Sequence, residues 1–369
     1  QKNSAFLGAE IPSLVMPEKI SKKNLRHASF SGRVALTTLE EAWRSSALDE
    51  IESDRVGLII GGSNVQQREV LLTQERYRNN PHFIRPHYGF SFMDSDLCGL
   101  CTECFNIQGL SCTVGGASAS GHLAILQAIS AVSSGQVDVC IALGALMDFS
   151  YFELQALRSL GAMGSDSFAQ QPDKACRPFD RDRDGFIFGE CCGAVVIERS
   201  DTAAQRGVGP YANIIGWAAG MDAHRNPSPS YEGEVKMIQQ ALRHANLSSR
   251  EIDYVNPHGT GSKIGDEVEL NAIVACGLSH AHINATKSIT GHGISAAGTV
   301  EVIATILQME ASRIHPTRQL ECPIKPELKW VCNEALFCNI EHALNLSIGF
   351  GGINTAICLR NCSQSVKAS

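Results

Sequence analysis

The sequence predicts an α/β protein built as two similar halves. Apolar runs of strand length alternate with helical patterns along most of the 369 residues, which is typical of layered α/β architectures. This alternation is interrupted by a charged stretch with Gly and Pro over 200–210 and then begins again. We therefore expect an N-terminal half over 1–200, a C-terminal half over 201–369 and a hinge at 200–210.

The first half is predicted from helical periodicity and from uncharged runs bounded by turn residues. Residues 1–35 are mixed and lack an apolar opening strand. The long, polar and aromatic-dotted stretch 63–98 is either a lid or tunnel wall, or a plain surface excursion. The expected elements, in chain order, are a helix over 36–48, strands over 56–62 and 110–114, a helix over 119–135, and strands over 137–144 and 193–198.

The second half repeats the pattern. Strand 137–144 of the first half has no charge after Asp138, which favours a sheet covered on both faces, and we expect the same layering here. The expected elements are a strand over 212–218, a helix over 233–246, strands over 252–256 and 283–286, a helix over 296–311, and strands over 344–348 and 355–360.

Composition excludes several classes of function. The net charge of −7 argues against a nucleic-acid-binding protein and against a broad basic membrane face, although a local basic patch for an acidic partner is compatible with it. We expect that no apolar run reaches membrane-spanning length, and no signal-peptide pattern opens the chain. We expect a cytoplasmic protein.

The 14 cysteines are scattered through apolar segments, which indicates reduced thiols and not a disulfide framework. Cys98, Cys101 and Cys104 form a CxxCxxC run of the kind that can bind zinc or an iron–sulfur cluster. A fourth ligand at matching spacing is missing, and helical spacing explains the run equally well. We interpret these residues as buried small hydrophobes and expect no metal.

The stretch with the clearest chemical signal runs from Gly109 to Ile129. A β-prone run over 110–114 meets a cluster of Gly, Ala and Ser, and an apolar helical pattern follows. Small residues at such a turn allow a sharp bend that exposes one side chain at a helix N-terminus, where backbone N–H groups favour negative charge. Ser118 is the candidate reactive side chain, although most Ser/Gly turns only cap helices.

Four further motifs follow this turn in order. They are Arg177-Pro-Phe-Asp-Arg-Asp-Arg-Asp-Gly-Phe-Ile-Phe-Gly-Glu190, Asn256-Pro-His-Gly-Thr-Gly261, Thr286-Lys-Ser-Ile-Thr-Gly-His292 and Gly349-Phe-Gly-Gly352. Together with the turn, they resemble the β-ketoacyl-ACP synthases (ketosynthases) of the thiolase superfamily, from about Val56 to Leu359. This resemblance implies the thiolase fold, with two similar halves stacked as five layers, αβαβα, and the site between them.

The resemblance also implies roles for individual residues. His258 and His292 match the two catalytic histidines of the family, and Lys287 and Glu301 match a buried pair that supports the loop of His292. Phe350 matches a gate over the reactive residue, and its N–H and that of Ser118 would form an oxyanion hole. The motif positions taken as structural are Thr260, Asp180 and Glu190.

One departure from the family decides the interpretation, because its members normally present cysteine at the turn where this chain has Ser118. Cys112 could be the nucleophile instead, but it lies within the predicted strand, six residues before the turn. Counting back from Asp138, which opens the next strand in the family pattern, leads to Ser118. The substitution of Cys by Ser is therefore taken as genuine.

Serine changes the expected reaction. A thiol near pKa ~8.5 gives an accessible thiolate, whereas a hydroxyl needs a positioned general base, and the two histidines are expected to bind the thioester carbonyl and not necessarily to deprotonate Ser118. Decarboxylation needs no nucleophile, only donors at the developing enolate oxygen. The pattern is similar to the Cys-to-Ser malonyl-ACP decarboxylases of bacterial polyketide β-branching cassettes, which supply acetyl-ACP beside an HMG-CoA-synthase-like enzyme.

Two alternatives stay open at this point. Ser118 could be a true nucleophile of an acyltransferase or a condensing synthase, which a stable acyl-Ser118 adduct would show. The chain could also be a non-catalytic chain-length partner of an active ketosynthase, although such partners have typically lost the histidines. A degenerate structural relic is the least favoured interpretation, because four motifs are intact.

The resemblance leads to further expectations. Ketosynthases are usually homodimers that pair the strand before the turn, here about 110–114, across a two-fold axis. No cofactor is implied, because the phosphopantetheine arm arrives on the acyl carrier protein. Four departures from the family pattern could narrow the acyl pocket to fit a two-carbon product: Cys191, Cys192, Ser295 and Ile348.

Overall fold

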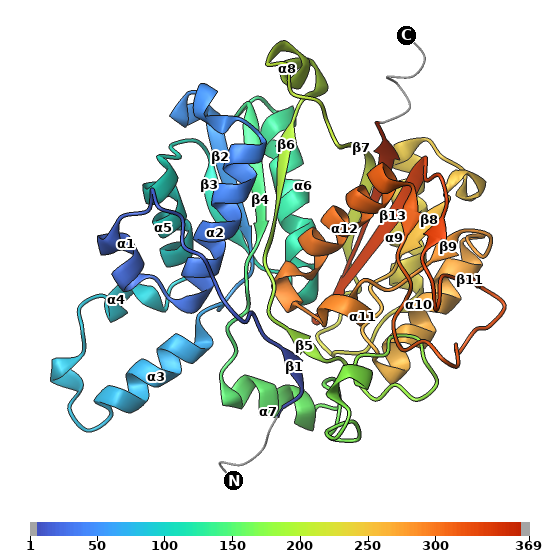
Figure 1. Ribbon diagram of the computed structural model, residues 1–369, viewed down its shortest axis with the longest axis horizontal. Coiled ribbons are helices and arrows are strands. Elements are labelled where there is room, and N and C mark those ends of the chain that lie inside the picture. Colours follow the sequence, from blue (N-terminus) through green and yellow to red (C-terminus); the bar gives the residue numbers. More distant parts are fainter. Residues whose placement is uncertain (1–5, 363–369) are drawn as a thin grey trace.

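The computed structural model describes residues 6–362 and contains two main β-sheets, one from each half of the sequence (Figure 1). The N-terminal sheet has the strand order β3-β2-β4-β6. Its strands β2, β3 and β4 are parallel, and β6 pairs antiparallel with β4. The bounds are β2 Val56–Gly61, β3 Ser111–Val114, β4 Val139–Gly144 and β6 Gly193–Glu198.

The C-terminal sheet has the order β11-β9-β8-β13-β14-β7. Its first four strands are parallel, and β14 is antiparallel to both β13 and β7. The bounds are β7 Ala212–Met221, β8 Tyr254–Asn256, β9 His282–Ile283, β11 Lys329–Trp330, β13 His342–Gly349 and β14 Ile353–Asn361.

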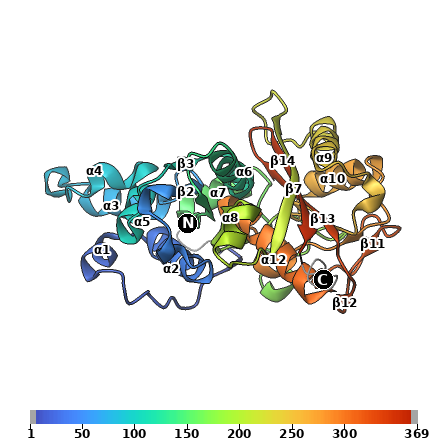
Figure 2. The same cartoon turned by 90° about the horizontal axis from the view of Figure 1, so that it is seen from above.

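Helices lie outside and between the two sheets. The N-terminal sheet is covered on its outer face by α2 (Phe30–Ser45) and α5 (Ser95–Phe105). Between the sheets lie α6 (Ser120–Ser133) and α12 (Ala297–Ala311), and the outer face of the C-terminal sheet is covered by α9 (Tyr231–Ala245) and α10 (Lys263–Ala275). Figures 1 and 2 show the resulting order, helix–sheet–helix–sheet–helix. The predicted five-layer α/β architecture is confirmed.

The buried core follows these layers, because each sheet and helix must cover its apolar face with another element. One cluster of buried residues, including Leu36, Ile60 and Leu97, lies between the N-terminal sheet and its outer helices. A second, including Ile125 and Val302, joins the two central helices to both sheets. A third fills the space under α9 and α10. Both β2 and β4 are buried along their whole length, as the charge-free pattern of β4 predicts.

The remaining elements are short. The helices are α1 Lys22–His27, α3 Gln67–Tyr77, α4 Tyr88–Ser91, α7 Tyr151–Ser159, α8 Ser200–Gln205 and α11 Lys287–Thr290. The 3-10 turns are η1 Leu48–Glu50, η2 Ser53–Arg55, η3 Pro81–Phe83, η4 Ala117–Ala119, η5 Pro172–Lys174, η6 Ser249–Glu251 and η7 Ile294–Ala296. Two-stranded pairs join β1 Gly8–Ala9 to β5 Phe188–Gly189, and β10 Arg313–Ile314 to β12 Leu336–Phe337.

Several element boundaries differ from the sequence prediction. The first long helix begins at Phe30 and not at 36, because the Ser29 side chain caps it by accepting from the N–H of Gly32 at 3.0 Å. Strand β9 ends at Ile283, where the predicted strand continues to 286, because the N–H of Ala285 donates to the Thr317 hydroxyl and not to a neighbouring strand. Helix α10 was not predicted.

The stretch 63–98 is a surface excursion except at its start, where Ser63, Asn64 and Gln67 line the main cavity of the protein. Its helices α3 and α4 project from the body of the protein, and α3 has no buried residue (Figures 1 and 2). Helix α8 occupies the predicted hinge between the sheets, and hinge motion there stays a prediction.

The sequence-based expectation that no apolar run reaches membrane-spanning length was wrong for one stretch. The 18 residues Ile294–Ala311 have the length and mean hydropathy of such a span. Of this stretch, 61% is buried inside the protein, where α12 packs between the sheets. Its hydropathy is therefore explained by its place in the core.

Candidate active site

Ser118 lies in the turn that joins β3 to α6, as predicted. It is the middle residue of η4, directly before α6. The preceding residue, Ala117, has a φ of 47°, a left-handed conformation that is uncommon for a residue with a Cβ. Gly349 packs so closely on this turn that a Cβ there would lie 2.2 Å from the carbonyl oxygen of Gly116. The turn therefore holds Ser118 beside the loop that follows β13.

His258 follows the end of β8, and its neighbours fix both its backbone and its ring. Its backbone N–H donates to Oε1 of Glu269 at 2.5 Å. Nζ of Lys287 lies 3.3 Å from Nδ1 of the ring and also donates to the His258 carbonyl oxygen. An ammonium group only donates hydrogen bonds, so Nδ1 is the acceptor and the ring proton resides on Nε2. His258 therefore offers an N–H donor at Nε2.

His292 lies in the loop between α11 and η7 and is fastened to the segment around β5. Its N–H donates to the carbonyl of Ile187 at 2.7 Å, and its own carbonyl accepts from Gly189 at 3.2 Å. The ring packs edge to face against Phe186, with centroids 5.1 Å apart. A Cβ on Gly189 would lie 1.9 Å from the carbonyl oxygen of Thr290, so this close approach requires glycine.

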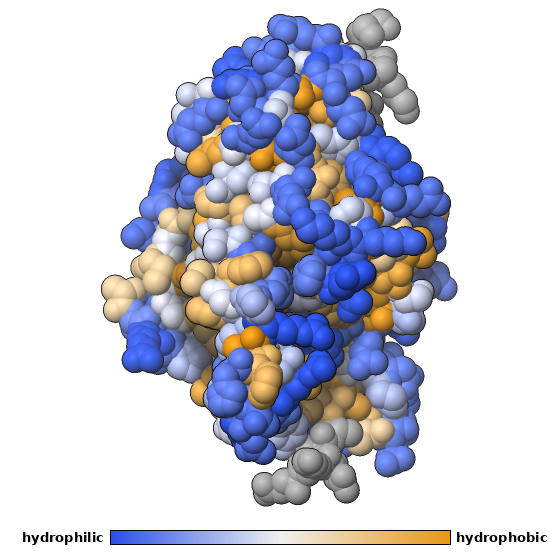
Figure 3. Space-filling model, turned by 90° about the vertical axis from the view of Figure 1, so that its left-hand side faces the viewer, coloured by the Kyte–Doolittle hydropathy of each residue, from blue (hydrophilic) through white to orange (hydrophobic). Residues whose placement is uncertain are grey.

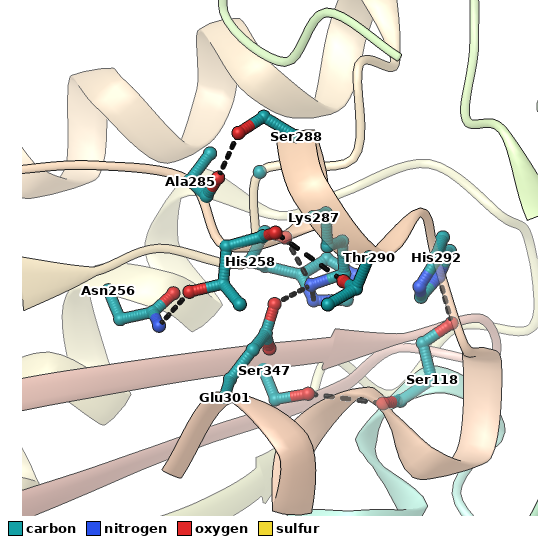
Figure 4. A network of polar contacts seen from close by, with 12 residues as sticks. Ser118, Asn256, His258, Ala285, Lys287, Ser288, Thr290, His292, Glu301 and Ser347 are labelled. Atoms are coloured by element: carbon teal, nitrogen blue, oxygen red, sulfur yellow. Dashed lines mark hydrogen bonds and ion pairs between the residues drawn. The ribbon is translucent and has the colours of Figure 1, made fainter. Parts of the chain in front are cut away.

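The structure brings Ser118 and both histidines together (Figure 4). Oγ of Ser118 lies 2.9 Å from Nε2 of His292, and the two imidazole rings pack edge to face with centroids 5.4 Å apart. This differs from the sequence-based expectation that the histidines need not lie where they could deprotonate Ser118. A base is within hydrogen-bond reach. However, Nδ1 of His292 has no hydrogen-bond partner among the described residues, so no third group orients the ring.

Burial gives the two histidines weak basicity. The pKa of His292 is lowered well below 6.5 by burial and then by the positive charge of Lys287. The pKa of His258 is lowered in the same way, with His292 and His122 as further causes. Both rings are therefore neutral at pH 7. A neutral ring with a depressed pKa is a poor base for a hydroxyl but remains a good N–H donor.

The predicted Lys287–Glu301 pair exists, but its ammonium group contacts a different histidine than expected. Nζ of Lys287 lies 2.5 Å from Oε1 of Glu301, and both side chains are buried. The contacts of Nζ go to His258, whereas the resemblance implies support for the loop of His292. Lys287 also opens α11, which ends just before His292. Burial raises the pKa of Glu301 to about 7, and Lys287 opposes this shift.

A cavity of about 710 Å³ contains these groups. Its wall includes Phe350 and Thr260, which the sequence singles out, and Phe350 is 43% exposed. Cys112 does not line it and lies exposed on β3. The apolar residues of the wall include Met147, Phe149, Leu157, Phe186, Ile294 and Ile348.

Of the four departures expected to narrow this pocket, only Ile348 lines the cavity. The Ser295 hydroxyl donates to the carbonyl of Ala145 at 2.7 Å. A Cβ added to Gly293 would lie 2.0 Å from the sulfur of Cys191. Cys191 therefore packs against the loop that carries His292. Cys192 packs against the N-terminal core.

The residues interpreted as structural make backbone contacts. The Thr260 hydroxyl accepts from the N–H of Ser262 at 3.2 Å, in addition to lining the cavity. Asp180 is fully buried and accepts from the N–H groups of Glu321 and Cys322, at 2.8 and 2.7 Å. Glu190 accepts from Ile11 at 2.9 Å.

Five acidic residues that line the cavity were missed by the sequence-based prediction: Glu153, Asp222, Glu234, Asp266 and Glu269. Glu269 accepts from the N–H groups of His258 and Gly259, at 2.5 and 2.9 Å, and Glu234 lines the wall with both carboxyl oxygens unpaired. Glu269 stands among the acidic residues Asp266 and Glu267, so its charge gave no distinct signal, and α10 was not predicted.

The CxxCxxC run lies on α5, where Cys98 and Cys101 belong to the buried core. Nδ2 of Asn24 lies 3.1 Å from the sulfur of Cys104. Across the part of the chain that the structure describes, no group of three or more His, Cys, Asp or Glu is arranged to hold a metal ion.

Two family models match this chain. The Beta-ketoacyl synthase, N-terminal domain, profile matches residues 16–203, and the Beta-ketoacyl synthase, C-terminal domain, profile matches residues 211–321. The chain belongs to the β-ketoacyl synthase family, and its fold is the thiolase fold of that family.

Individual relatives refine this assignment. The chain is 60% identical over 364 residues to "Polyketide biosynthesis malonyl-ACP decarboxylase PksF" of Bacillus subtilis, covering 99% of this chain and 88% of that protein. Among solved structures, a beta-ketoacyl synthase from Burkholderia phymatum has a TM-score of 0.86 at 26% identity, covering 98% and 90% of the two chains. A type II ketosynthase in complex with its acyl carrier protein, AntDE:AntF, has a TM-score of 0.80 at 25% identity, covering 96% and 87%.

Proposed function

We propose that this protein decarboxylates malonyl-ACP to acetyl-ACP. The observation that carries the proposal is that serine occupies the nucleophile position while both histidines are retained around one cavity, with the proton of His258 on Nε2. The 60% identity to a malonyl-ACP decarboxylase supports it. The relatives are bacterial, and the pathway supplied is polyketide biosynthesis.

The reaction follows from the donors around the cavity. The bond between C2 of the malonyl group and its carboxylate breaks, CO₂ leaves, and the electron pair forms an enolate with its charge on the thioester oxygen. N–H donors of His258 and His292 stabilise that oxygen in a site of low polarity, and the backbone N–H groups of Ser118 and Phe350 are proposed as further donors. Protonation of C2 by water then gives the acetyl thioester. No covalent enzyme intermediate is needed.

The acyltransferase alternative has one observation in its favour, the 2.9 Å contact between Ser118 and His292. Two observations oppose it: the depressed pKa of His292 and the lack of a partner at its Nδ1 among the described residues. A hydroxyl has no accessible anion without a competent base. The chain-length-partner alternative is disfavoured because both histidines lie in the cavity.

Intact mass spectrometry of malonyl-ACP incubated with the wild-type protein and with His292→Ala tests this function. We expect conversion to acetyl-ACP by the wild type, loss of most conversion in the variant, and no mass added to the enzyme. Unchanged malonyl-ACP together with acylated Ser118 would establish acyl transfer instead. If neither is seen, the partner role becomes the best explanation.

We also propose a homodimer. Strand β3 is at one end of its sheet, and its outer edge pairs with no strand within residues 6–362. Figure 3 shows apolar groups scattered over the same side of the molecule, among hydrophilic ones. The exposed apolar residues of this region are Leu72, Phe83, Phe90, Phe92, Met93 and Leu110. An unpaired edge next to apolar side chains favours pairing with a second copy.

The remaining elements of the proposal follow from the family. The acyl carrier protein brings the phosphopantetheine arm, so the enzyme itself is proposed to need no metal or cofactor. The acetyl product would pass to an HMG-CoA-synthase-like enzyme of the same pathway. A cytoplasmic location fits the many free thiols.

A further inference from the structure

Glu234 is a buried acid in the cavity wall that the proposed reaction does not use. It lies in the first turn of α9, after the helix cap at Ser230. Its side chain is 3% exposed, and it lines the same cavity as Ser118, His258 and His292. Neither carboxyl oxygen has a hydrogen-bond partner within the described part of the chain. A buried polar group without a partner is uncommon and costs stability.

The surroundings of Glu234 favour the protonated, neutral form of its carboxyl group. Burial raises its pKa well above 4.5, and the negative charges of Glu269 and Asp222 raise it further. Glu269 differs from it, because it accepts two backbone N–H groups, whereas Glu234 accepts none. A neutral carboxyl group carries one O–H donor. Glu234 therefore presents a donor in the cavity wall without an acceptor.

The charges near Glu234 limit which group of the substrate can accept a hydrogen bond from its carboxyl O–H. The substrate brings three kinds of acceptor: the thioester oxygen, the malonyl carboxylate and the amide carbonyls of the phosphopantetheine arm. In the proposed mechanism, the thioester oxygen accepts hydrogen bonds from the two histidines. Burial raises the pKa of Glu269 to about 8, so the negative charge that a carboxylate beside Glu234 would face is that of Asp222. This charge repels a carboxylate, whereas a neutral amide carbonyl meets no such repulsion.

The position of Glu234 fits the arm as well. The same cavity wall includes the exposed residues Asn226, Pro227 and Ser228, from the loop that leads into α9, and the exposed Phe350. The arm must enter from the surface past such residues to reach Ser118. A donor on this wall is suited to orienting the arm along its path.

We propose that the carboxyl O–H of Glu234 donates a hydrogen bond to an amide carbonyl of the pantetheine arm and thereby selects pantetheine-borne thioesters. This inference rests on the proposed function for its substrate. It makes Glu234 a specificity-determining residue, which binds the part of the substrate that does not react.

Kinetics with two soluble substrates test the inference. Malonyl-pantetheine carries the amides, and the malonyl thioester of propanethiol carries none. For Glu234→Leu, we expect KM for malonyl-pantetheine to rise about tenfold, as loss of one hydrogen bond to a buried donor implies, with kcat within about twofold of the wild type. With the propanethiol thioester, the wild type and the variant should have equal kcat/KM.

Matched variants separate recognition from packing. Glu234→Gln keeps an N–H donor and should stay within about twofold of the wild-type KM. Met237→Leu changes a buried residue of the same helix that does not line the cavity, and it should leave both substrates unaffected. Because neither carboxyl oxygen of Glu234 has a hydrogen-bond partner among residues 6–362, Glu234→Leu should melt at the wild-type temperature or higher.

Three results would overturn the inference: an unchanged KM in Glu234→Leu, an equal loss on both thioesters, or a loss in Glu234→Gln as large as in Glu234→Leu. If the wild-type protein decarboxylates neither these two thioesters nor malonyl-ACP, the proposed function fails, and a separate measurement still tests the role of Glu234. Titration calorimetry with pantetheine alone should then show about tenfold weaker binding to Glu234→Leu than to the wild type. Equal affinities would overturn it.

Discussion

Nζ of Lys287 lies 3.3 Å from Nδ1 of His258, so a buried ammonium group fixes which nitrogen of this histidine carries the proton. Glu301 holds the same ammonium group at 2.5 Å. The three residues act as one unit, in which a carboxylate positions a lysine and the lysine orients a ring. In the proposed mechanism, this contact preorganises the N–H at Nε2 of His258 for the developing enolate oxygen, a form of stabilisation that is usually the largest in such reactions.

Lys287→Met should lower both stability and activity. It leaves Glu301 buried without its partner, and because the carboxyl group then takes up a proton, the cost in the free energy of unfolding is about 1–3 kcal/mol, that of an unsatisfied polar group. Decarboxylation should fall by up to about 100-fold, because the proton of His258 is no longer held on Nε2. Denaturant unfolding and a malonyl-ACP assay measure the two effects.

The double variant Lys287→Met/Glu301→Leu is the control for this prediction. Replacing both partners by apolar residues should recover most of the stability, while decarboxylation stays low. Full activity in the double variant would show that the tautomer of His258 does not depend on Lys287.

Ser118→Ala should retain decarboxylation within about tenfold of the wild type, because the reaction as proposed forms no bond to Oγ. Only the 2.9 Å contact with His292 is removed. Ser118→Cys should become acylated, since a thiolate is accessible near neutral pH and an alkoxide is not. Intact mass spectrometry after incubation with acetyl-ACP would show an acetyl adduct in Ser118→Cys. Loss of all decarboxylation in Ser118→Ala would contradict the mechanism.

His122 should make the protein sensitive to acid. Its pKa is lowered from 6.5 to about 3 by burial and then by Lys287, so the unfolded chain binds a proton between these values and the folded protein does not. The stability that His122 contributes is present above pH 6.5 and is lost as the pH falls toward 3, by up to about 1.4 kcal/mol per pH unit.

Denaturant unfolding at pH 7 and at pH 4.5 tests the contribution of His122. His122→Gln can keep the hydrogen bond to the Thr355 hydroxyl, 3.0 Å from Nδ1, and does not titrate. It should therefore lose less stability than the wild type over this range. Identical losses in the two proteins would mean that His122 does not titrate as described.

The edge strand β3 should control oligomeric state. Cys112→Lys places a charge on the exposed face of this strand, and two copies paired there would bring like charges together. We expect a shift from dimer to monomer in light scattering after size exclusion. Phe337→Lys, at an exposed position on β12, is the control and should remain dimeric. A Cys112→Lys dimer as stable as the wild type would place the interface elsewhere.

Much of the architecture follows from local patterns. The sequence predicts strands β2 and β4 and the turn at Ser118. In these segments the spacing of apolar residues, the turn residues and the burial all agree. Helix α10 was missed, and with it Glu269. Its 13 residues combine acidic side chains with apolar ones, and its inward face becomes recognisable only once it packs on the C-terminal sheet beside α9.

The sequence by itself determined the family, the fold class and the identity of the residue at the nucleophile position, because these depend on ordered motifs and on the periods of strands and helices. Only the tertiary structure decided that His292 contacts Ser118, that Lys287 holds His258, and that Glu234 lies unpaired in the cavity wall. These relationships join residues up to 174 positions apart, and their distances depend on how two sheets and the helices between them pack. No local pattern carries that information.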